Sequence, residues 1–391
     1  MRCRRARPDG GATTSRRGRP VADRPRRIPF LEPELPELAG LADDLAEVHG
    51  SGVFSNGGPF DRKLAANVES YLGGGHCVPV ASATAGLMLA IDALARRDAT
   101  RKVLLPSFTF AASALAVEWA GFEPLFCDID EASWQPAPDA SFVERNRDRI
   151  ALILVCNTFG SPADIGAWKN IAAASGIPIV VDSASGFGGS YADGSRLGRA
   201  GVTEVFSMHA TKPLAVGEGG LIVTDDAALA GRLRSARNFG LDEQRICAVR
   251  GLNGKLPELS AAIACRVLER YDDIVGHRRR LAARYRERLE PAGFAFQRHG
   301  ELSPFQAVPV IVPPAVSRDE FQRRLEGDGI ETRRYFAAPL HTHPHLRGCE
   351  TAGALDVTDA VAHRIVCLPM SNRLADADVE RVCASALAVC T

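Results

Sequence analysis

The chain has 391 residues, 46% hydrophobic and 24% charged, which is typical of a globular protein large enough to form two domains. Its 47 basic and 47 acidic residues balance, so the overall charge gives no reason to expect binding to nucleic acid or to a membrane. The ten cysteines lack paired or metal-ligand spacing, and no apolar run reaches the ~18 residues of a membrane span, so we expect a cytoplasmic protein without a metal site.

The first segment, residues 1–27, is predicted to be a disordered extension. It holds ten arginines together with Gly, Pro, Ser and Thr, but almost no large apolar side chains. A role in RNA binding or targeting is an alternative for this segment. Against targeting, no apolar stretch follows the twin arginines Arg16 and Arg17.

From residue 28 onward, short apolar runs alternate with amphipathic stretches. The runs predict strands, and the stretches predict helices, in the following places: strands near 103–105, 124–127, 152–155, 179–181 and 221–224, and helices over 60–71, 84–95, 113–120 and 165–174. Such alternation indicates a mainly parallel sheet with helices on both faces. We therefore expect a large α/β domain over residues 28–270.

The remainder of the chain no longer shows this regular alternation of strands and helices. A helix is predicted over 226–238 and ends near Gly240, a plausible C-cap. One long helical pattern from 257 to about 289 then links the domains. Isolated strands, a helix over 318–328 and a last helix near 376 indicate a smaller α+β domain over residues 271–391.

Two residues carry the strongest chemical signal. The chain has only five lysines among its 47 basic residues, and Lys212 lies five residues after Ser207 and shortly before the pair Gly219 and Gly220. A lysine amine can form an imine, which arginine cannot. Asp182 ends a predicted strand, at the edge where open α/β sheets bind ligands. A strand-end aspartate followed by such a lysine is typical of a pyridoxal phosphate site.

Nine short segments place these residues in a wider pattern. In chain order they are Ser55-Asn-Gly-Gly-Pro59, Ala81-Ser-Ala-Thr-Ala-Gly86, Pro106-Ser-Phe-Thr-Phe110, Phe159-Gly-Ser-Pro-Ala-Asp164, Asp182-Ser-Ala-Ser185, the segment around Lys212, Arg237-Asn-Phe-Gly240, Gly251-Leu-Asn-Gly-Lys255 and Pro339-Leu-His341. Through them the chain resembles, from about residue 54 to 383, the DegT/DnrJ/EryC1/StrS aminotransferases. These are fold type I pyridoxal phosphate enzymes, so the resemblance implies a mainly parallel seven-stranded sheet and a smaller C-terminal α+β domain.

The resemblance also assigns residues to the cofactor, pyridoxal 5'-phosphate. Ser82, Ala83 and Thr84 open a predicted helix, whose N-terminus favours a phosphate, and Ser207 matches a further phosphate ligand. Helix capping is the alternative role for Ser82 and Thr84. Phe110 matches the aromatic residue that stacks on the cofactor ring, with a place in the core as its alternative.

Asp182 is expected at the pyridine nitrogen. At ~4 Å and an effective dielectric constant of ~20 this charge pair gains roughly 4 kcal/mol, which keeps the nitrogen protonated. The alternative is an aspartate that only caps the next helix. Two departures alter the surroundings of the ring: Ser185 stands where many relatives have Gln or His contacting it, and Asn157 where His is frequent.

The remaining expectations concern substrate and assembly. Asn253 matches an asparagine that reaches the phosphate from a partner subunit, which implies a homodimer with shared active sites; an ordinary loop residue is the alternative. Asn56 and His341 are expected near the substrate, and a solvated loop is the alternative for His341. The Asn-Phe-Gly and Gly-x-Asn-Gly-Lys spellings look most like the branch that acts on keto-sugar nucleotides.

The resemblance thus implies transamination by a ping-pong mechanism, from an amino donor such as glutamate to a keto-sugar nucleotide or related ketone. Lys212 would hold the cofactor's aldehyde and shuttle the proton. Two alternatives remain. One is a pyridoxal phosphate enzyme of another class, such as elimination, replacement or cyclisation on an amino acid; the other is a non-catalytic regulator that binds nucleic acid through its arginine-rich segment.

Overall fold

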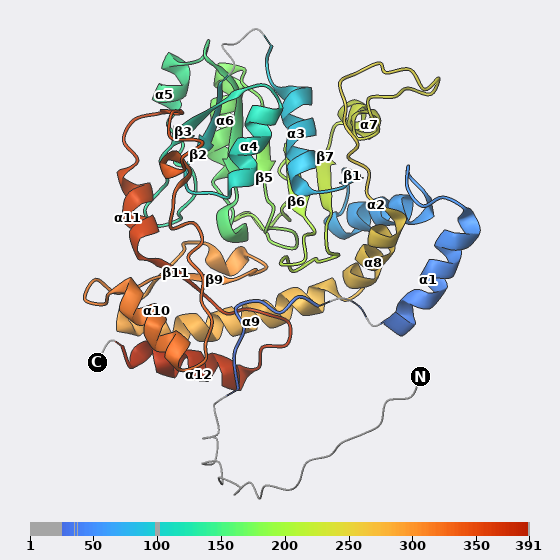
Figure 1. Ribbon diagram of the computed structural model, residues 1–391. Helices are drawn as coiled ribbons and strands as arrows, with labels where there is room; N and C mark the ends of the chain where they lie inside the picture. Colours follow the sequence, from blue (N-terminus) through green and yellow to red (C-terminus); the bar gives the residue numbers. More distant parts are fainter. Residues whose placement is uncertain (1–25, 35, 37, 98–101, 390–391) are drawn as a thin grey trace, which may run out of the picture.

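The computed structural model describes residues 26–34, 36, 38–97 and 102–389 (Figure 1). Its main sheet has the strand order β1-β7-β6-β5-β4-β2-β3-β10. The strands are β1 (His76–Val80), β2 (Lys102–Pro106), β3 (Glu123–Cys127), β4 (Ile150–Cys156), β5 (Ile179–Asp182), β6 (Thr203–Ser207), β7 (Gly220–Thr224) and β10 (Glu350–Thr351). Strand β7 runs antiparallel to both of its neighbours, β1 and β6, and the other neighbouring strands pair in parallel. The expected mainly parallel sheet is confirmed, and β10, from the C-terminal part of the chain, adds an eighth strand to the expected seven.

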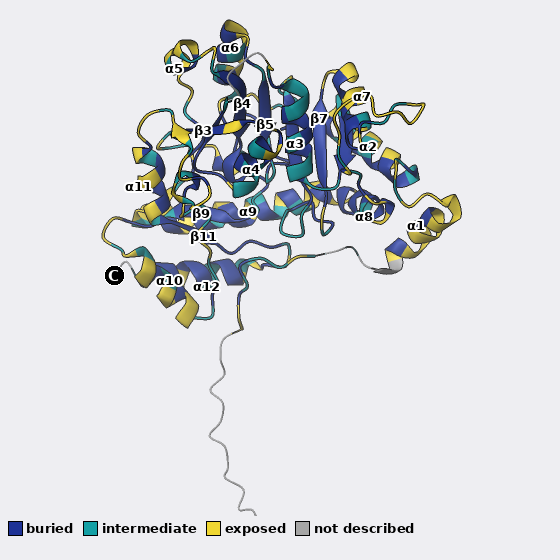
Figure 2. Ribbon diagram, turned by 45° about the horizontal axis from the view of Figure 1, so that its top comes forward, coloured by how far each residue is buried: buried dark blue, intermediate teal, exposed yellow. Residues whose placement is uncertain are grey.

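Helices cover both faces of this sheet because its strands send apolar side chains to both sides. In β4, Leu152 and Leu154 pack on one face, while Ile153 and Val155 pack on the other. The first face is covered by α3 (Ala83–Leu94), α4 (Ala111–Trp119) and α7 (Ala227–Ala236), and the second by α2 (Pro59–Leu72), α5 (Ala140–Arg145), α6 (Ile165–Ser175) and α8 (Glu258–Leu268). Figure 2 shows the resulting buried strands in dark blue.

A second, antiparallel sheet has the order β11-β9-β8. Its strands are β8 (Ala295–Phe296), β9 (Val308–Ile311) and β11 (Ile365–Leu368), and it packs with α9 (Tyr271–Leu289), α10 (Arg318–Gly327) and α12 (Asp376–Leu387). Figure 1 shows α9 passing between the main sheet and α12, with α11 (Asp356–Arg364) at one side and α1 (Leu38–Ser51) at the other. We keep the start of α9 as the proposed boundary between the two domains.

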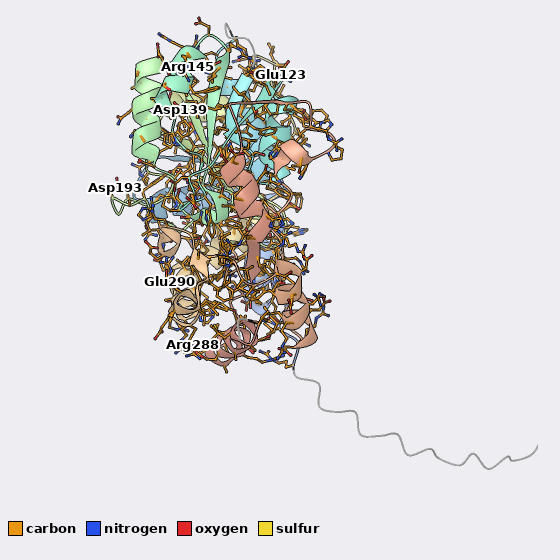
Figure 3. The ribbon with its side chains drawn as sticks, turned by 90° about the vertical axis from the view of Figure 1, so that its left-hand side faces the viewer. Glu123, Asp139, Arg145, Asp193, Arg288 and Glu290 are labelled. Atoms are coloured by element: carbon orange, nitrogen blue, oxygen red, sulfur yellow. The ribbon has the colours of Figure 1, made fainter. Side chains whose placement is uncertain are left out.

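Figure 3, a side view, shows charged side chains on the outside of both domains. Asp139 and Arg145 lie beside α5 on the large domain, and Arg288 and Glu290 lie at the end of α9 on the small one. All four are exposed, as charged side chains usually are.

The single long helix expected over residues 257–289 is in fact two helices, α8 and α9. Arg270 leaves helical geometry, with φ −113° and ψ 13°. This turn directs Tyr271 into the core, where its hydroxyl donates to the carbonyl oxygen of Phe187 at 2.7 Å and its ring packs on Tyr71 and Phe187. A period-based prediction misses the break because both helices keep their own apolar faces.

Most of the expected extension, residues 1–25, lies outside the described residues. Its last two residues, Arg26 and Arg27, form ion pairs with Asp378 and Glu331. Ile28 follows directly and packs in the core of the smaller sheet rather than the main one. In the described ranges no helix is long and apolar enough to span a membrane, and no three His, Cys, Asp or Glu side chains group as metal ligands.

Candidate active site

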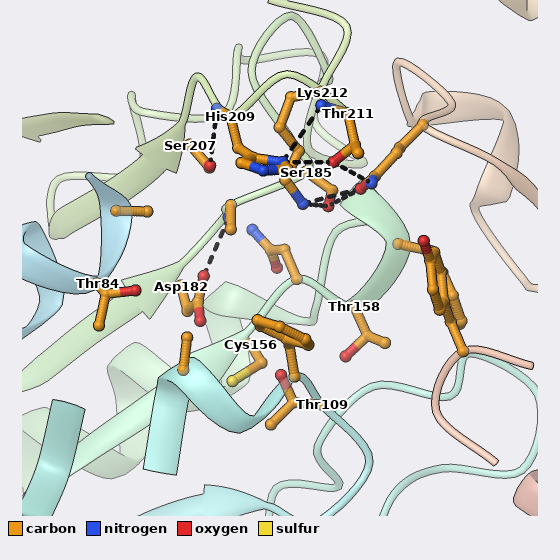
Figure 4. Close-up of a pocket in the computed structure, with 18 of the residues that line it drawn as sticks. Thr84, Thr109, Cys156, Thr158, Asp182, Ser185, Ser207, His209, Thr211 and Lys212 are labelled. Carbon is orange, nitrogen blue, oxygen red and sulfur yellow. Dashed lines mark hydrogen bonds between the residues drawn. The ribbon is translucent and has the colours of Figure 1, made fainter. Parts of the chain in front are cut away.

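A cavity of about 450 Å³ opens at the carboxyl ends of the parallel strands, where α/β sheets bind ligands. Eight of the eleven expected site residues line it: Ser82, Ala83, Thr84, Phe110, Asp182, Ser185, Ser207 and Lys212. They come from the start of α3, the start of α4, the ends of β5 and β6 and the loops that follow those strands. Figure 4 shows how Thr84, Asp182 and Lys212 approach the same space from different elements.

The N-terminus of α3 forms one wall. Ser82 caps the helix by accepting a hydrogen bond from the amide of Ala85 at 3.1 Å, so its capping role is real. The backbone amides of Ala83 and Thr84 have no acceptor within the helix. They lie at the helix N-terminus, where the helix dipole favours a bound anion. Gly220 makes this wall possible, because a Cβ there would lie 2.6 Å from the Ala83 nitrogen. Ser207 ends the neighbouring strand β6 beside them.

Asp182 lies at the end of β5 and is only 8% exposed. Its carboxylate accepts hydrogen bonds from the Ser113 hydroxyl at 2.6 Å and from the Ala184 amide at 3.0 Å. Burial raises the pKa of Asp182, while these hydrogen bonds and the charge of Lys212 oppose that rise. A cationic group in the cavity would therefore favour the ionised carboxylate further.

Lys212 points into the cavity from the loop after β6. Its Nζ donates to Ser185 Oγ and to Gln306 Oε1, each at 2.8 Å (Figure 4 draws the bonds of Lys212 as dashed lines). Burial lowers the pKa of Lys212 from 10.5 to about 8, and the nearby Asp182 charge opposes this only in part. An appreciable fraction of the amine is thus unprotonated and nucleophilic near neutral pH.

Aromatic side chains form the rest of the wall. Phe110 lines the cavity with 66% of its surface exposed, which makes it available to a flat ligand and excludes the alternative of a core residue. Across the cavity, the rings of Phe159 and Phe336 pack with centroids 5.2 Å apart. Gly160, at φ 80°, lets this segment approach the loop of Ser185, since a Cβ there would lie 2.3 Å from the Ser185 carbonyl oxygen.

Three expected site residues do not line the cavity. Asn56 is exposed and in the left-handed region, at φ 68°. Asn253 is also exposed, and its side-chain oxygen accepts a hydrogen bond from its own chain's Lys255 at 2.6 Å. His341 packs against Ser107, with 2.8 Å between Nδ1 and Oγ, and lies 3.3 Å from Asp359. Within one chain, none of the three reaches the cavity.

Sequence reasoning missed several residues of the wall. Gln306, Tyr335 and Phe336 come from irregular segments of the small domain, and Thr211 directly precedes Lys212. No periodicity or motif marks them. Asn157, which stands where His is frequent in the family, lines the cavity. Its amide group has a structural role, because it donates to Ser183 Oγ at 2.7 Å.

These residues fit pyridoxal phosphate on chemical grounds. A phosphate suits the helix N-terminus and its small residues, a protonated pyridine nitrogen suits a buried carboxylate, and an aldehyde suits an amine with a lowered pKa. The exposed face of Phe110 suits a flat aromatic ring. The described wall of the cavity provides all four features together.

The chain is similar to several known proteins. A protein of Mycobacterium tuberculosis, Rv3402c, is 39% identical over 92% of this chain and 89% of its own. The dTDP-3-amino-3,4,6-trideoxy-alpha-D-glucose transaminase of Streptomyces venezuelae is 31% identical over 89% of this chain and 92% of its own. A Bacillus cereus crystal structure, provisionally named a PLP-dependent aminotransferase, superposes with a TM-score of 0.87 at 31% identity and covers 92% of this chain and 100% of its own.

The family model for the DegT/DnrJ/EryC1/StrS aminotransferase family matches residues 39–387, which include most of both domains and every residue of the cavity wall. The chain therefore belongs to the DegT/DnrJ/EryC1/StrS aminotransferase family.

Proposed function

We propose that the protein is a pyridoxal phosphate-dependent aminotransferase that transfers an amino group from an amino acid, such as glutamate, to a keto-sugar nucleotide or related ketone by a ping-pong mechanism. One observation carries the proposal: a single cavity is bounded by Lys212, Asp182 and the N-terminus of α3. The transaminase of Streptomyces venezuelae supports the choice of a sugar acceptor.

Each residue has a physical role in this proposal. The cofactor, when bound, supplies an electron sink for the bond cleaved at the amino acid's α-carbon. Asp182 would keep a proton on the pyridine nitrogen, and the amides of Ala83 and Thr84 with the Ser207 hydroxyl would hold the phosphate. The Lys212 Nζ would hold the cofactor's aldehyde carbon and, when free, would move the α-proton, which requires the unprotonated amine that its low pKa provides.

The test begins with Lys212→Ala. The wild-type protein should develop a visible absorption band with pyridoxal phosphate, and glutamate should bleach it with release of one equivalent of 2-oxoglutarate. Lys212→Ala should do neither, whereas Lys169→Ala, an exposed lysine bonded to the Ala200 carbonyl, should behave as wild type. Borohydride-stable cofactor in Lys212→Ala would place the anchor on another lysine. A wild-type band that glutamate leaves unchanged would favour another reaction class.

We further propose a homodimer in which Asn253 completes the partner's site. The described residues of the cavity wall include no arginine, so cations for the carboxylates of glutamate or the phosphates of a nucleotide have to come from beyond it. Exposed apolar side chains lie near Asn56 and Asn253: Phe54 is 57% exposed, Leu259 50% and Phe239 49%. The backbone joins them, since Glu258 donates to the Phe54 carbonyl and Phe239 to that of Leu252.

Mixed dimers test this arrangement. Lys212→Ala and Asn253→Ala should each be defective, the second through weaker cofactor retention. Reassembled together at limiting cofactor, they should recover up to about a quarter of wild-type sites, because half the dimers are mixed and each carries one intact site. Activity no better than the sum of the two variants, in mixed dimers confirmed by mass, would mean that Asn253 does not cross the interface.

A further inference from the structure

The Lys212 amine is held by two groups that also contact each other. Nζ donates to Ser185 Oγ and to Gln306 Oε1, each at 2.8 Å, and Ser185 Oγ donates to the same Gln306 oxygen at 2.7 Å. Ser185 follows β5 of the large domain, whereas Gln306 lies two residues before the start of β9 in the small domain. The contact therefore joins the amine to both domains.

The orientation of the Gln306 amide is fixed by its neighbours. Its oxygen faces two donors, and its Nε2 donates to Thr211 Oγ1 at 3.2 Å. Thr211 Oγ1 is in turn 2.9 Å from His209 Nδ1. A rotated amide would place its NH₂ group against the lysine amine and leave that amine with one acceptor fewer, so the observed orientation satisfies the network.

The backbone around Gln306 is also anchored. The carbonyl oxygen of Phe305 accepts a hydrogen bond at 2.8 Å from Arg278, a guanidinium only 4% exposed on α9. Ala307 on the other side is buried as well. The amide is thus presented to Lys212 by a rigid part of the small domain rather than by a solvated loop.

We propose that Gln306 is a positioning residue for Lys212, and that its side-chain oxygen sets the direction and the protonation of the amine from across the domain boundary. The catalytic consequence rests on the proposed function, in which the Lys212 amine has to be free during part of each half-reaction. It then needs a defined position and orientation in the cavity. Without Gln306, Lys212 Nζ would keep only one of these two acceptors, the Ser185 hydroxyl oxygen. That hydroxyl would also lose the acceptor that fixes its own direction, because it donates its single hydrogen to Gln306.

The electrostatic surroundings give this contact a measurable effect. The titratable side chains in the described cavity wall, other than Lys212 itself, are Asp182, Cys156, His209, Glu218 and Tyr335. The Asp182 charge raises the pKa of Lys212, and burial lowers it by more. The Gln306 oxygen is a dipole aimed at Nζ, so it favours the protonated amine without adding a charge.

The experiment follows the protonation of Lys212 directly, in the cofactor-free protein. With only five lysines in the chain, isotope-labelled lysine side chains give few NMR signals, and the signal lost in Lys212→Ala is the one to follow. Gln306→Leu removes the acceptor at similar size and should lower the midpoint of the titration by about one pH unit, a tenfold change in the equilibrium. Gln306→Glu adds a charge and should raise it.

Gln322→Leu is the matched control, because Gln322 lies on α10 of the same domain and bonds to Thr332 and Arg334 away from the cavity. It should leave the titration of Lys212 unchanged. With cofactor and glutamate, Gln306→Leu should lower kcat by roughly tenfold and change KM little, since the amine rather than the substrate is displaced. Opposite shifts in the Leu and Glu variants are a signature that a purely structural role cannot produce.

Two results separate this inference from the proposed function. If Gln306→Leu and Gln306→Glu titrate as the wild type does, Gln306 does not position the amine, whatever the reaction is. If the wild type takes up no pyridoxal phosphate, the proposed function fails, while the titration still reports on the contact. If Gln306→Leu does not fold, the Lys212 titration of Gln306→Glu alone tests whether residue 306 contacts the amine.

Discussion

Two buried carboxylates on neighbouring strands, Asp182 and Glu204, differ in what surrounds them. Asp182 is 8% exposed and Glu204 0%. In the register of β5 and β6, Glu204 pairs with Val181 and Val205 with Asp182, so the two carboxylates point to opposite faces of the sheet. One opens onto the cavity, and the other is sealed beneath it.

Their hydrogen bonds differ accordingly. Asp182 has two donors from its own chain, Ser113 and Ala184. Glu204 has four: the hydroxyls of Ser183 and Tyr191, the amide of Asn157 and the backbone NH of Gly198. Three of these donors meet Oε1 and one meets Oε2, so Glu204 uses four hydrogen bonds where Asp182 uses two, on a group with about four acceptor positions.

This difference separates a structural carboxylate from one that can serve a ligand. Burial raises the pKa of both groups, to about 7 for Glu204, even though the hydrogen bonds oppose the rise. A perturbed pKa therefore does not identify a catalytic group by itself. Unused acceptor capacity that faces a cavity does, and only Asp182 of the two has it.

The largest expected effect is on activity. Asp182→Asn should retain the fold and bind cofactor but lower the rate of amino transfer about 10²- to 10³-fold, because an amide cannot hold the pyridine nitrogen protonated. Glu204→Gln is its partner in the comparison and should remain close to the wild-type rate. The rate at which glutamate bleaches the cofactor's absorption band in a single turnover measures the effect of both variants. Comparable losses in the two variants would remove the distinction drawn between these carboxylates.

The next effect is on stability. Glu204 is protonated up to about pH 7 in the folded state but only up to about its ordinary 4.5 when unfolded, so the folded state binds more protons between these values. This contribution to stability is present below pH 4.5 and is lost as the pH rises through 7, at most roughly 3 kcal/mol. Urea unfolding at several pH values should show the decline in the wild type and its absence in Glu204→Gln.

The sequence predicted the cavity better than the sheet around it. Lys212, Asp182 and the Ser82 turn carry chemistry in their residue types, and the structure brings them together. Strand β6 was not predicted, since Glu204 interrupts its apolar run, and the short strand β1 was missed as well. The partners of Glu204 converge from separate loops, which no local pattern reports.

Gln306 shows the same limit inside the site. It lies in a stretch without periodicity, more than ninety residues after Lys212, and meets the lysine only because the small domain folds back onto the large one. Residue type gave no signal, because glutamine is ordinary in a loop. By contrast, local caps and apolar stripes predicted eight helix starts to within a few residues, those of α2, α3, α4, α6, α7, α8, α10 and α12. The starts of α1, α5, α9 and α11 were not predicted.

A smaller effect is expected from Ser113→Ala, which removes the 2.6 Å hydrogen bond to Asp182. That bond lowers the pKa of Asp182, so its loss should raise the pKa and move the acid limb of the pH-rate profile to higher pH. Near the acid limb the rate should fall about tenfold. Ser175→Ala is the control, because its buried hydroxyl bonds to the Ile171 carbonyl far from the cavity. An unmoved acid limb would mean that Ser113 only packs there.

The smallest effect tests the sealed side, with Tyr191→Phe. The Tyr191 hydroxyl donates to Glu204 at 3.2 Å, and burial keeps that phenol neutral by raising its pKa well above 10. Below pH 7 the acceptor is a neutral carboxyl, and a bond of this kind contributes about 1 kcal/mol; above pH 7 the acceptor is charged and the loss should approach roughly 2 kcal/mol. The destabilisation should therefore grow with pH.

Tyr285→Phe provides the matched control for this last prediction. Its hydroxyl is also buried and donates over the same 3.2 Å, but to the carbonyl oxygen of Pro369, which does not titrate. Its cost should be constant between pH 5 and pH 8, on the order of 1 kcal/mol. Chemical unfolding of both variants at these two pH values measures the difference. If Tyr191→Phe is as independent of pH as Tyr285→Phe, then Glu204 does not change its charge in this range. The four donors to Glu204 would then hold one protonation state throughout, and the comparison with Asp182 would rest on the number of hydrogen bonds alone.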